Sequence, residues 1–392
     1  MKSSKPQFDG QGVKLGDVAT YINGYAFKPA DYSLNGKQII RIQDLTGNAY
    51  QTNNFAGELD DKYLVSSGDV LISWSASLGV FEWNKEEAWL NQHIFKVVFN
   101  KLPVDKRYFI HQARYVINRG AMLAHGATMR HLTKKVFESL PFSYPNRSEQ
   151  LTIAKRLDDI QRQIYLAEKQ ISKLDSLVKS RFIEMFGDPV EENRWARITL
   201  ASLCTKLGSG ATPRGGKAAY KTSGIPLIRS MNVHNGYFES KDLAYIDEIQ
   251  AKKLDNVTLH KGDVLLNITG ASVARSCLLP DYLAGGRVNQ HVSIVRCDPN
   301  RMLPRVLNSI FTSDSYQRFL LEHSRMAGAT REAITKDDLE TMTVPLPPLS
   351  LQYKFAAFVA QVDKSRFGGM LHLLNGLSGI MHASFFSVAD TD

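Results

Sequence analysis

The most constraining feature of this sequence is a long internal repeat, because the same short motifs return in the same order. The motifs recur at displacements of 188, 194, 198 and 202 residues: Ile39-Ile40-Arg41-Ile42 as Leu227-Ile228-Arg229-Ser230, Gly68-Asp69-Val70-Leu71 as Gly262-Asp263-Val264-Leu265, Asn91-Gln92-His93 as Asn289-Gln290-His291, and Gly126-Ala127-Thr128 as Gly328-Ala329-Thr330. Gln150 returns as Gln352, again displaced by 202. Small steps in displacement indicate short loop insertions between two copies. Because a copy of roughly 190 residues is far longer than a solenoid repeat, the sequence predicts a duplicated domain.

Each copy is predicted to have a mixed α/β fold. Short apolar runs after Gly-Asp turns indicate strands, and longer amphipathic runs indicate helices. The predicted strands are Val70–Ile72, Ile94–Phe99, Val264–Leu266 and Val292–Val295, and the predicted helices are Lys106–Asn118 and Pro304–Glu322. Prolines at 141 and 145, and at 345, 347 and 348, predict an extended exit from each copy. We therefore predict globular domains at residues 1–149 and 190–350, a central long helix at 150–189 and a distal helix at 351–392.

The segment after the first copy has the clearest periodicity in the chain. Its apolar residues alternate spacings of four and three, which is the 3.5-residue period of a left-handed coiled coil. These seam residues are Ile153, Leu157, Ile160, Ile164, Ala167, Ile171, Leu174 and Val178. They predict one helix from Gln150 to Phe186, against which the distal helix packs through Phe355, Val359 and Val362. Gly368-Gly369 predict a weak or broken distal helix, although Gly369 and Gly376 would equally allow two helices to approach closely.

Charge and composition favour a polyanionic partner. The net charge is +9, and residues 1–149 and 190–350 each contribute +4 of it. No stretch reaches the ~20 apolar residues of a membrane span, and the first residues lack an apolar signal core, so a cytoplasmic protein is expected. The three cysteines, Cys204, Cys277 and Cys297, lie far apart without a CxxC pair. We expect reduced, partly buried thiols.

The sequence lacks the usual signatures of catalysis on nucleotides or DNA. The glycine-rich segment 208–218 fails the phosphate-loop template, since Ala218 stands where Ser or Thr is required. An Asn-Pro-Pro-Tyr type motif of adenine methyltransferases is also missing. His93 and His291 could act as a metal ligand or base. A structural, hydrogen-bonded role is favoured because neither has an obvious second ligand and both lead into a predicted strand.

The ordered motifs resemble those of specificity subunits of type I restriction-modification systems. The resemblance covers nearly the whole chain and is closer in the second copy, with Lys206–Pro213, Gly224–Arg229, Lys261–Leu265, Asn289–His291, Gly328–Thr330 and Val344–Gln352. The first copy departs from the pattern at Ile22–Phe27 and Pro141–Pro145.

In such a subunit each copy is a target-recognition domain for half of a bipartite, gapped site in double-stranded DNA. The resemblance implies two antiparallel helices that separate the domains around a pseudo-twofold axis. It also implies docking of two methyltransferase subunits, with restriction and translocase subunits in the full complex. No catalytic residue and no metal ligand are expected in this chain, since S-adenosylmethionine, magnesium and ATP would belong to the partners.

Base edges require directed donors and acceptors, so polar and cationic residues near the repeated motifs are the candidate DNA contacts. They are Lys28, Arg41, Gln43, Trp74, Ser75, Ser77 and Arg130 in the first copy and Arg214, Lys217, Arg229, Asn232, Thr269, Ser272, Arg275 and Arg331 in the second. Two other functions stay open at this point. One is a stand-alone DNA-modifying or nucleotide-using enzyme with a site at each Asn-Gln-His motif, and the other is a protein scaffold built around the coiled coil.

Overall fold

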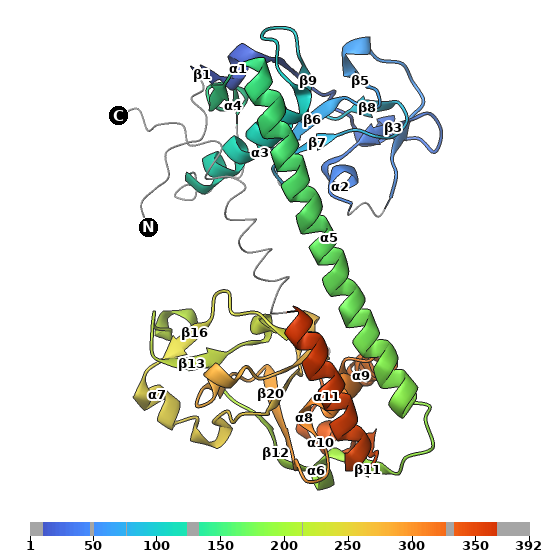
Figure 1. The fold of residues 1–392 in the computed structure, drawn as a ribbon, viewed down its shortest axis with the longest axis vertical. Helices are drawn as coiled ribbons and strands as arrows, with labels where there is room; N and C mark the ends of the chain where they lie inside the picture. Colours follow the sequence, from blue (N-terminus) through green and yellow to red (C-terminus); the bar gives the residue numbers. More distant parts are fainter. Residues whose placement is uncertain are drawn as a thin grey trace. The chain divides into compact units, whose positions relative to one another are not determined.

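The computed structural model describes residues 11–47, 51–75, 77–123, 133–213, 215–326 and 333–366. These residues form two compact units, one up to Glu168 and the other from Lys169 onward. Helix α5, Arg147–Phe186, contributes to both units (Figure 1). Each unit is described by itself. None of the described helices is both long and apolar enough to cross a membrane.

The first unit is built on two small four-stranded sheets (Figure 1). One has the antiparallel order β2-β9-β6-β7, with β2 Thr20–Asn23, β9 Ile94–Val98, β6 Val70–Ser73 and β7 Gly79–Glu82. The other has the order β4-β3-β8-β5, with β4 Asn54–Phe55, β3 Lys37–Ile40, β8 Ala88–Leu90 and β5 Leu64–Val65. In this second sheet β3 and β8 run parallel.

The remaining elements of the first unit close its ends and cover its core. Strand β1 pairs antiparallel with β10, so the start and the exit of the copy lie together. These elements are β1 Gln11–Lys14, α1 Leu15–Val18, α2 Ile42–Leu45, α3 Lys106–Leu123, α4 Lys134–Glu138 and β10 Pro141–Tyr144. The main core buries Phe109, Phe137 and Phe142, and the first turns of α5 add Ile153 and Leu157 to it.

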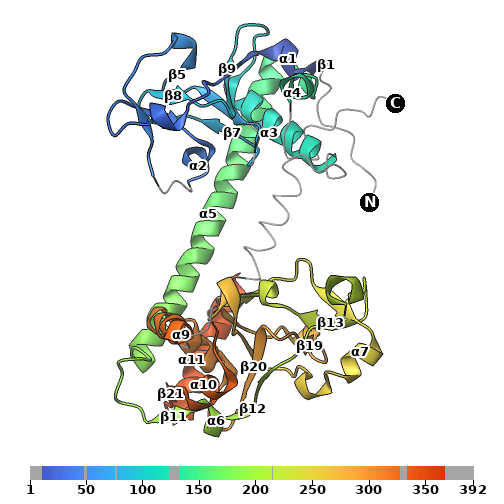
Figure 2. The ribbon, with the colours of Figure 1, turned by 180° about the vertical axis from the view of Figure 1, so that it is seen from behind.

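The second unit repeats this plan (Figure 2). Its antiparallel sheet has the order β12-β20-β17-β18, with β12 Cys204–Ser209, β20 Val292–Cys297, β17 Val264–Asn267 and β18 Ser276–Leu278. Its mixed sheet has the order β16-β13-β19, with β16 Ala244–Ile246, β13 Ile225–Ile228 and β19 Arg287–Val288. Strands β13 and β19 are parallel, as β3 and β8 are in the first unit.

The other elements of the second unit include a further hairpin and a helical layer. The start and exit of this copy also pair, through β11 and β21. These elements are β11 Arg197–Thr199, α6 Leu200–Leu203, β14 Val233–His234, β15 Tyr237–Phe238, α7 Glu248–Lys252, α8 Pro304–Phe311, α9 Asp314–Met326, α10 Lys336–Thr341, β21 Thr343–Pro345 and α11 Leu349–Ser365. The prediction of two mixed α/β copies is confirmed by this repeated topology.

One predicted helix is wrong in its extent. The segment 304–322 is divided into α8 and α9, which are separated at Thr312 and Ser313. The Thr312 hydroxyl donates to the Asn308 carbonyl at 2.8 Å, which closes α8. The Ser313 hydroxyl accepts from the Tyr316 N–H at 3.4 Å, and its carbonyl accepts from the Gln317 N–H at 2.9 Å, so Ser313 caps α9. Two polar residues that satisfy helix ends therefore outweigh a continuous amphipathic pattern.

The long central helix is present, but its first seam residues do not pack as predicted. Ile153 and Leu157, each 1% exposed, belong to the core of their own domain and not to a helix pair. A 3.5-residue period identifies the buried face of a helix but leaves its partner unspecified. Of the seam residues further along, Ala167 is buried, and the others are half-buried: Ile160, Ile164, Ile171, Leu174 and Val178. Of these, Val178 packs against the core of the second unit.

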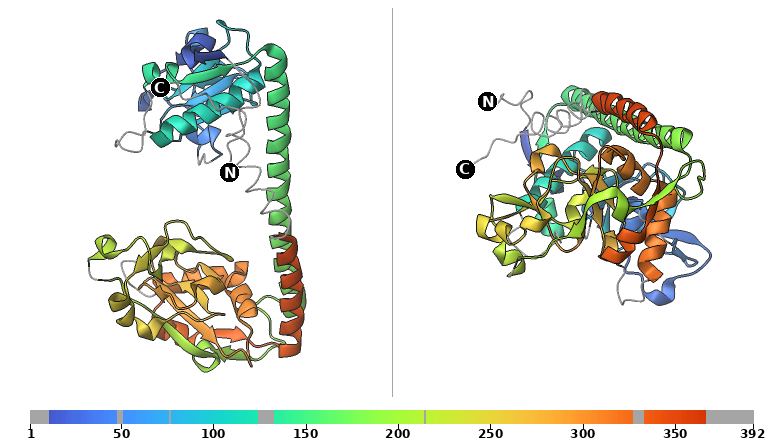
Figure 3. Two further views of the ribbon diagram at one scale, coloured as in Figure 1. Left: turned by 60° about the vertical axis from the view of Figure 1, so that its left-hand side comes forward. Right: turned by 90° about the horizontal axis from the view of Figure 1, so that it is seen from below.

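Helix α11 lies beside the C-terminal part of α5 (Figure 3). The Phe355 ring contacts Phe182 and Phe186 of α5, with ring centroids 5.6 and 5.4 Å apart. Val359 is buried in the same core, and Val362 is buried as well. The predicted break at Gly368-Gly369 and the distal segment beyond it lie outside the described residues. The predicted domain limits stay a prediction.

Candidate nucleic-acid interface

In each unit, two parallel strands bring an arginine and the Asn-Gln-His motif to one edge of the mixed sheet. Ile40 at the end of β3 is in register with Leu90 at the end of β8, and the next residues are Arg41 and Asn91. The second unit repeats this arrangement. There Ile228 of β13 is in register with Val288 of β19, and Arg229 and Asn289 follow. The carboxyl ends of parallel strands meet at the same edge, so the topology gathers motifs that lie about 50 to 60 residues apart.

The Asn-Gln-His motif forms the same turn in both copies. The asparagine Oδ1 accepts from the histidine N–H two residues later, at 3.3 Å for Asn91 and His93 and at 3.1 Å for Asn289 and His291. This is the side-chain-to-backbone bond typical of asparagine in turns. The turn also bonds to the segment that starts each copy, since Tyr25 O accepts from the Gln92 N–H at 2.9 Å. The duplicated motif therefore has a structural use in its own backbone.

Polar side chains extend this turn in the second copy. Thr212 Oγ1 donates a hydrogen bond to Gln290 Oε1, and Gln290 Nε2 lies 3.0 Å from His291 Nε2. Thr269, a predicted contact residue that follows β17, shares a hydrogen bond of 2.5 Å with His291 Nδ1. Both ring nitrogens of His291 therefore face protein groups. This orientation suits a positioned donor or acceptor better than a free catalytic base.

In the first copy an aromatic cluster surrounds the histidine of the Asn-Gln-His turn. Trp74, which corresponds to Ile268 by the repeat, lies 5.7 Å from the His93 ring and stacks on Phe95 at 5.8 Å. Ser75, which corresponds to Thr269, is buried at 7% exposure. The two copies therefore share a backbone arrangement and differ in the side chains that cover it.

Arg229 is held in a defined orientation. Its guanidinium lies over the Tyr220 ring, 5.3 Å from the centroid, and donates to the Asp242 carbonyl. The backbone N–H of Arg229 donates to Asn232 Oδ1 at 3.1 Å. In the first copy the backbone N–H of Arg41 likewise donates to Asp44 Oδ2 at 2.7 Å. No side-chain hydrogen bond or ion pair of Arg41 is found among the described residues. Both arginines are half-buried at the sheet edge.

Asn232 is a correction to the predicted contact set. Its side chain is fully buried, and Nδ2 donates to the carbonyls of Glu239 and Lys241 at 2.9 and 3.2 Å. With its oxygen bonded to Arg229, the amide has no face to offer a duplex. Asn232 therefore holds the backbone of Arg229 in place. Its position next to the motif in the sequence could not distinguish this supporting role from direct contact with DNA.

The other predicted residues lie on loops or short helices. Lys28 and Ser77 are exposed, and Gln43, Ser272 and Arg275 are half-buried. Lys217 lies in the short 3-10 helix Gly216–Ala219. Three predicted residues lie outside the described residues: Arg130, Arg214 and Arg331.

A hairpin beside Arg229 was missed by the sequence reasoning. Strands β14 and β15 are joined by Asn235 and Gly236, and Gly236 has φ of 85°. Tyr237 is 57% exposed and stacks on His234, with ring centroids 4.8 Å apart. An Asn-Gly pair is the strongest short hairpin signal in a sequence, so this element could have been found.

Thiol and metal chemistry find little support in this region. Burial raises the pKa of the Cys204, Cys277 and Cys297 thiols to about 12 each. Thiolates, the reactive and metal-binding form, are therefore scarce at neutral pH. Over the ranges that the structure covers, no group of three or more His, Cys, Asp or Glu side chains could hold a metal ion.

Comparison with known proteins finds similar chains and a matching family model. Residues 9–176 match the family model described as the type I restriction modification DNA specificity domain. The chain is 22% identical over 383 residues to the type I restriction enzyme EcoBI specificity subunit of Escherichia coli, covering 89% of this chain and 78% of the relative. It is 21% identical over 380 residues to the MjaVIII specificity subunit of Methanocaldococcus jannaschii, covering 91% and 86%. The chain is therefore similar to type I specificity subunits over most of its length.

The fold agrees with a solved structure of a type I specificity subunit. The type I restriction-modification S subunit from M. genitalium matches with a TM-score of 0.54 and 13% identity over 99% of each chain. The family model covers the first copy and most of α5, up to residue 176. The second copy repeats the order of the antiparallel sheet, whereas its mixed sheet has three strands in place of four, and it has its own set of side chains at the sheet edge.

Proposed function

We propose that this chain is a type I specificity subunit that recognises a bipartite, gapped sequence in double-stranded DNA, one half-site per copy. The observation that supports the proposal is the duplicated sheet edge. Each copy presents an arginine and an Asn-Gln-His turn at the ends of two parallel strands. The backbone arrangement is shared, whereas Trp74 and Ser75 in one copy correspond to Ile268 and Thr269 in the other. Equal scaffolds with different polar and aromatic groups suit two different half-sites.

In this proposal the chain has no active site and directs partner subunits to the DNA. Two methyltransferase subunits would supply S-adenosylmethionine chemistry, and restriction and translocase subunits would use magnesium and ATP. The long α5, a helix of 40 residues, connects the exit of one copy to the segment that leads into the next. Half-site spacing mirrors such protein geometry in other DNA-binding assemblies. An enzyme with a site at each Asn-Gln-His motif is less favoured, because both ring nitrogens of His291 face protein groups.

Modified-base sequencing tests the proposal directly. Genomic DNA would be compared between cells that have this gene with its methyltransferase partner and cells that lack only this gene. Loss of one gapped methylation motif on deletion is the expected result. Unchanged methylation, with the partner shown to be active, would contradict the proposal and favour the enzyme or scaffold.

Replacing Arg229 by alanine is expected to weaken recognition of one half-site only. A bidentate contact to a base contributes about 1–3 kcal/mol, so specific binding should fall by roughly fivefold to 150-fold. The measurement is binding of the complex to duplexes with each half-site randomised in turn. Arg41→Ala is the matched control in the other copy and should weaken the other half-site. Equal weakening of both half-sites by Arg229→Ala, in a protein with unchanged thermal unfolding, would be incompatible with one reader per copy.

A further inference from the structure

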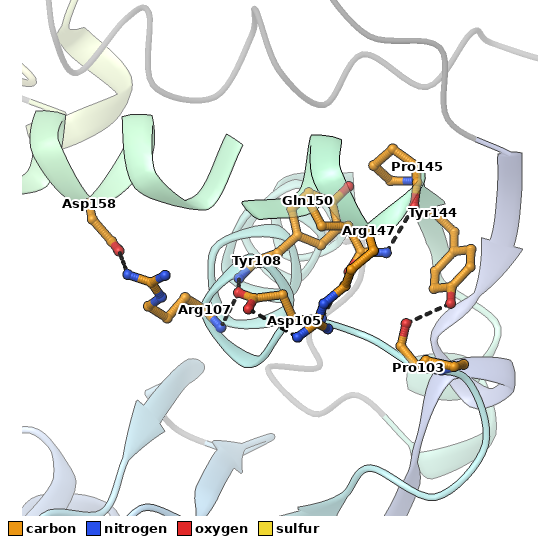
Figure 4. A network of polar contacts seen from close by, with 9 residues as sticks. All are labelled: Pro103, Asp105, Arg107, Tyr108, Tyr144, Pro145, Arg147, Gln150 and Asp158. Carbon is orange, nitrogen blue, oxygen red and sulfur yellow. Dashed lines mark hydrogen bonds and ion pairs between the residues drawn. The ribbon is translucent and has the colours of Figure 1, made fainter. Parts of the chain in front are cut away.

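A glutamine at the start of each exit helix joins that helix to its own domain. Gln150, 1% exposed, lies in the first turn of α5 (Figure 4). Its Oε1 accepts from the N–H of Asp105, and its Nε2 donates to the carbonyl of Pro145, both at 2.8 Å. Asp105 caps α3, because its Oδ1 accepts from the N–H groups of Arg107 and Tyr108 at 3.1 Å. One side chain therefore connects the start of α3, the exit of the domain and the start of α5.

The second copy repeats this joint with the same atoms. Gln352, fully buried in the first turn of α11, accepts from the N–H of Leu303 at 2.8 Å and donates to the carbonyl of Pro347 at 2.8 Å. Leu303 precedes Pro304 at the start of α8, as Asp105 precedes α3. A third bond runs from Nε2 to the Arg301 carbonyl at 2.9 Å, so both N–H groups of the amide have an acceptor. The two glutamines are related by the repeat, and so are the backbone groups that they bridge.

An ion pair braces each joint further along the helix. In the first copy Arg107 of α3 contacts Asp158 of α5 at 3.1 Å, and the buried His111 ring lies 2.7 Å from the same carboxylate. In the second copy Arg305, the repeat counterpart of Arg107, contacts Asp363 of α11 at 3.0 Å. Two attachment points on one helix fix its direction, whereas a single point would leave it free to pivot.

Burial alone does not explain why both positions, 150 and 352, are glutamine. A leucine would fill the same space without the need to satisfy a polar amide, and buried polar groups are costly unless every bond is made. In both copies the amide oxygen bonds to a chain segment distant in sequence, namely 45 residues away for Asp105 and 49 for Leu303. Directed bonds specify an angle, which apolar contact alone does not.

We propose that Gln150 and Gln352 are positioning residues that fix the angle of each exit helix to its domain and thereby set how strictly the gap length is recognised. The inference rests on the proposed reading of a gapped site. One added base pair moves a half-site by about 3.4 Å and rotates it by roughly 35°, so only a rigid joint rejects it. A loosened joint would accommodate the wrong gap while the base contacts stay intact.

The test measures methylation by the complete complex of this subunit with its methyltransferase partner. Duplexes would have the native gap and gaps one base pair shorter or longer. In Gln150→Leu and Gln352→Leu the preference for the native gap is expected to fall about fivefold, the effect of one net hydrogen bond, with recognition of both half-sites retained. Gln150→Asn keeps an amide that is too short to bridge both segments. It serves as a second variant if the leucine variant does not fold, and it should broaden the gap profile too.

Gln317→Leu is the matched control. Gln317 also donates to two backbone carbonyls, those of Ala274 and Phe311 at 2.7 and 2.5 Å, but these bonds lie inside the second domain. It should lower stability and leave the gap profile sharp. Equal broadening in Gln317→Leu, or an unchanged profile in both joint variants, would overturn the positioning role while gapped recognition stands. A wild-type complex without any gapped site would overturn the proposed function and this inference together.

Discussion

Replacing Arg296 by methionine is expected to lower the free energy of unfolding by about 3–5 kcal/mol, because it leaves a buried charge without its partner. Asp263 lies in the turn before β17, and its side chain has no exposed surface. Arg296 binds both oxygens of that carboxylate, with Nε to Oδ1 at 2.6 Å and one terminal nitrogen to Oδ2 at 2.8 Å. Methionine keeps an unbranched apolar stem of similar packing and removes the guanidinium group with its charge and donors. The measurement is urea denaturation of the isolated subunit.

The first copy supplies the control for this prediction. Asp69 occupies the same place in the Gly-Asp turn, but it is 27% exposed and pairs with Lys96 at 3.1 Å. Water can solvate this carboxylate, so Lys96→Met should cost about 1 kcal/mol or less. The double variant Asp263→Asn with Arg296→Met should recover part of the loss, since no unpaired charge is left. A cost for Arg296→Met no larger than for Lys96→Met would show that burial of Asp263 is not the cause.

Features determined by local sequence were predicted well. The turn at Gly68-Asp69 and its repeat at Gly262-Asp263 precede strands β6 and β17, because the glycines adopt positive φ, 92° and 84°, and the aspartates accept a backbone N–H. The long α5 followed from the spacing of its apolar residues. The Asn-Gln-His turns were assigned a structural, hydrogen-bonded role because both lead into strands. These signals act over a few residues, so a single sequence contains them.

Features determined by tertiary contacts were not predicted. Burial of Ile153 and Leu157 in the first domain depends on α3 and β10, which the periodicity of α5 does not describe. Asn232 was predicted to face DNA, yet its amide is turned inward to the carbonyls of Glu239 and Lys241. The contact of Gln150 with its own domain could not be predicted either, since its Oε1 accepts from the N–H of Asp105, 45 residues earlier. Repetition of the glutamine was the only sequence signal of that joint.

Replacing Phe355 by alanine is expected to detach α11 and to lower the free energy of unfolding by about 3–5 kcal/mol. Phe355 has no exposed surface, and its ring lies between Phe182 and Phe186 of α5 and the core of the second unit. Removal of the ring leaves a cavity between α5, α11 and the core of the second unit. Most helical stability in proteins comes from tertiary packing of the apolar face, so α11 depends on this contact for its order.

Hydrogen exchange distinguishes loss of α11 from a general loss of stability. In Phe355→Ala the amides of α11 should exchange at least about tenfold faster than those of β17 and β20, because a local opening now precedes global unfolding. Tyr353→Ala is the control on the same helix. Tyr353 is 59% exposed, and its replacement should change stability by about 0.5 kcal/mol or less. Equal acceleration in α11 and in the sheet would mean that Phe355 supports the whole domain and that α11 is not a separable element.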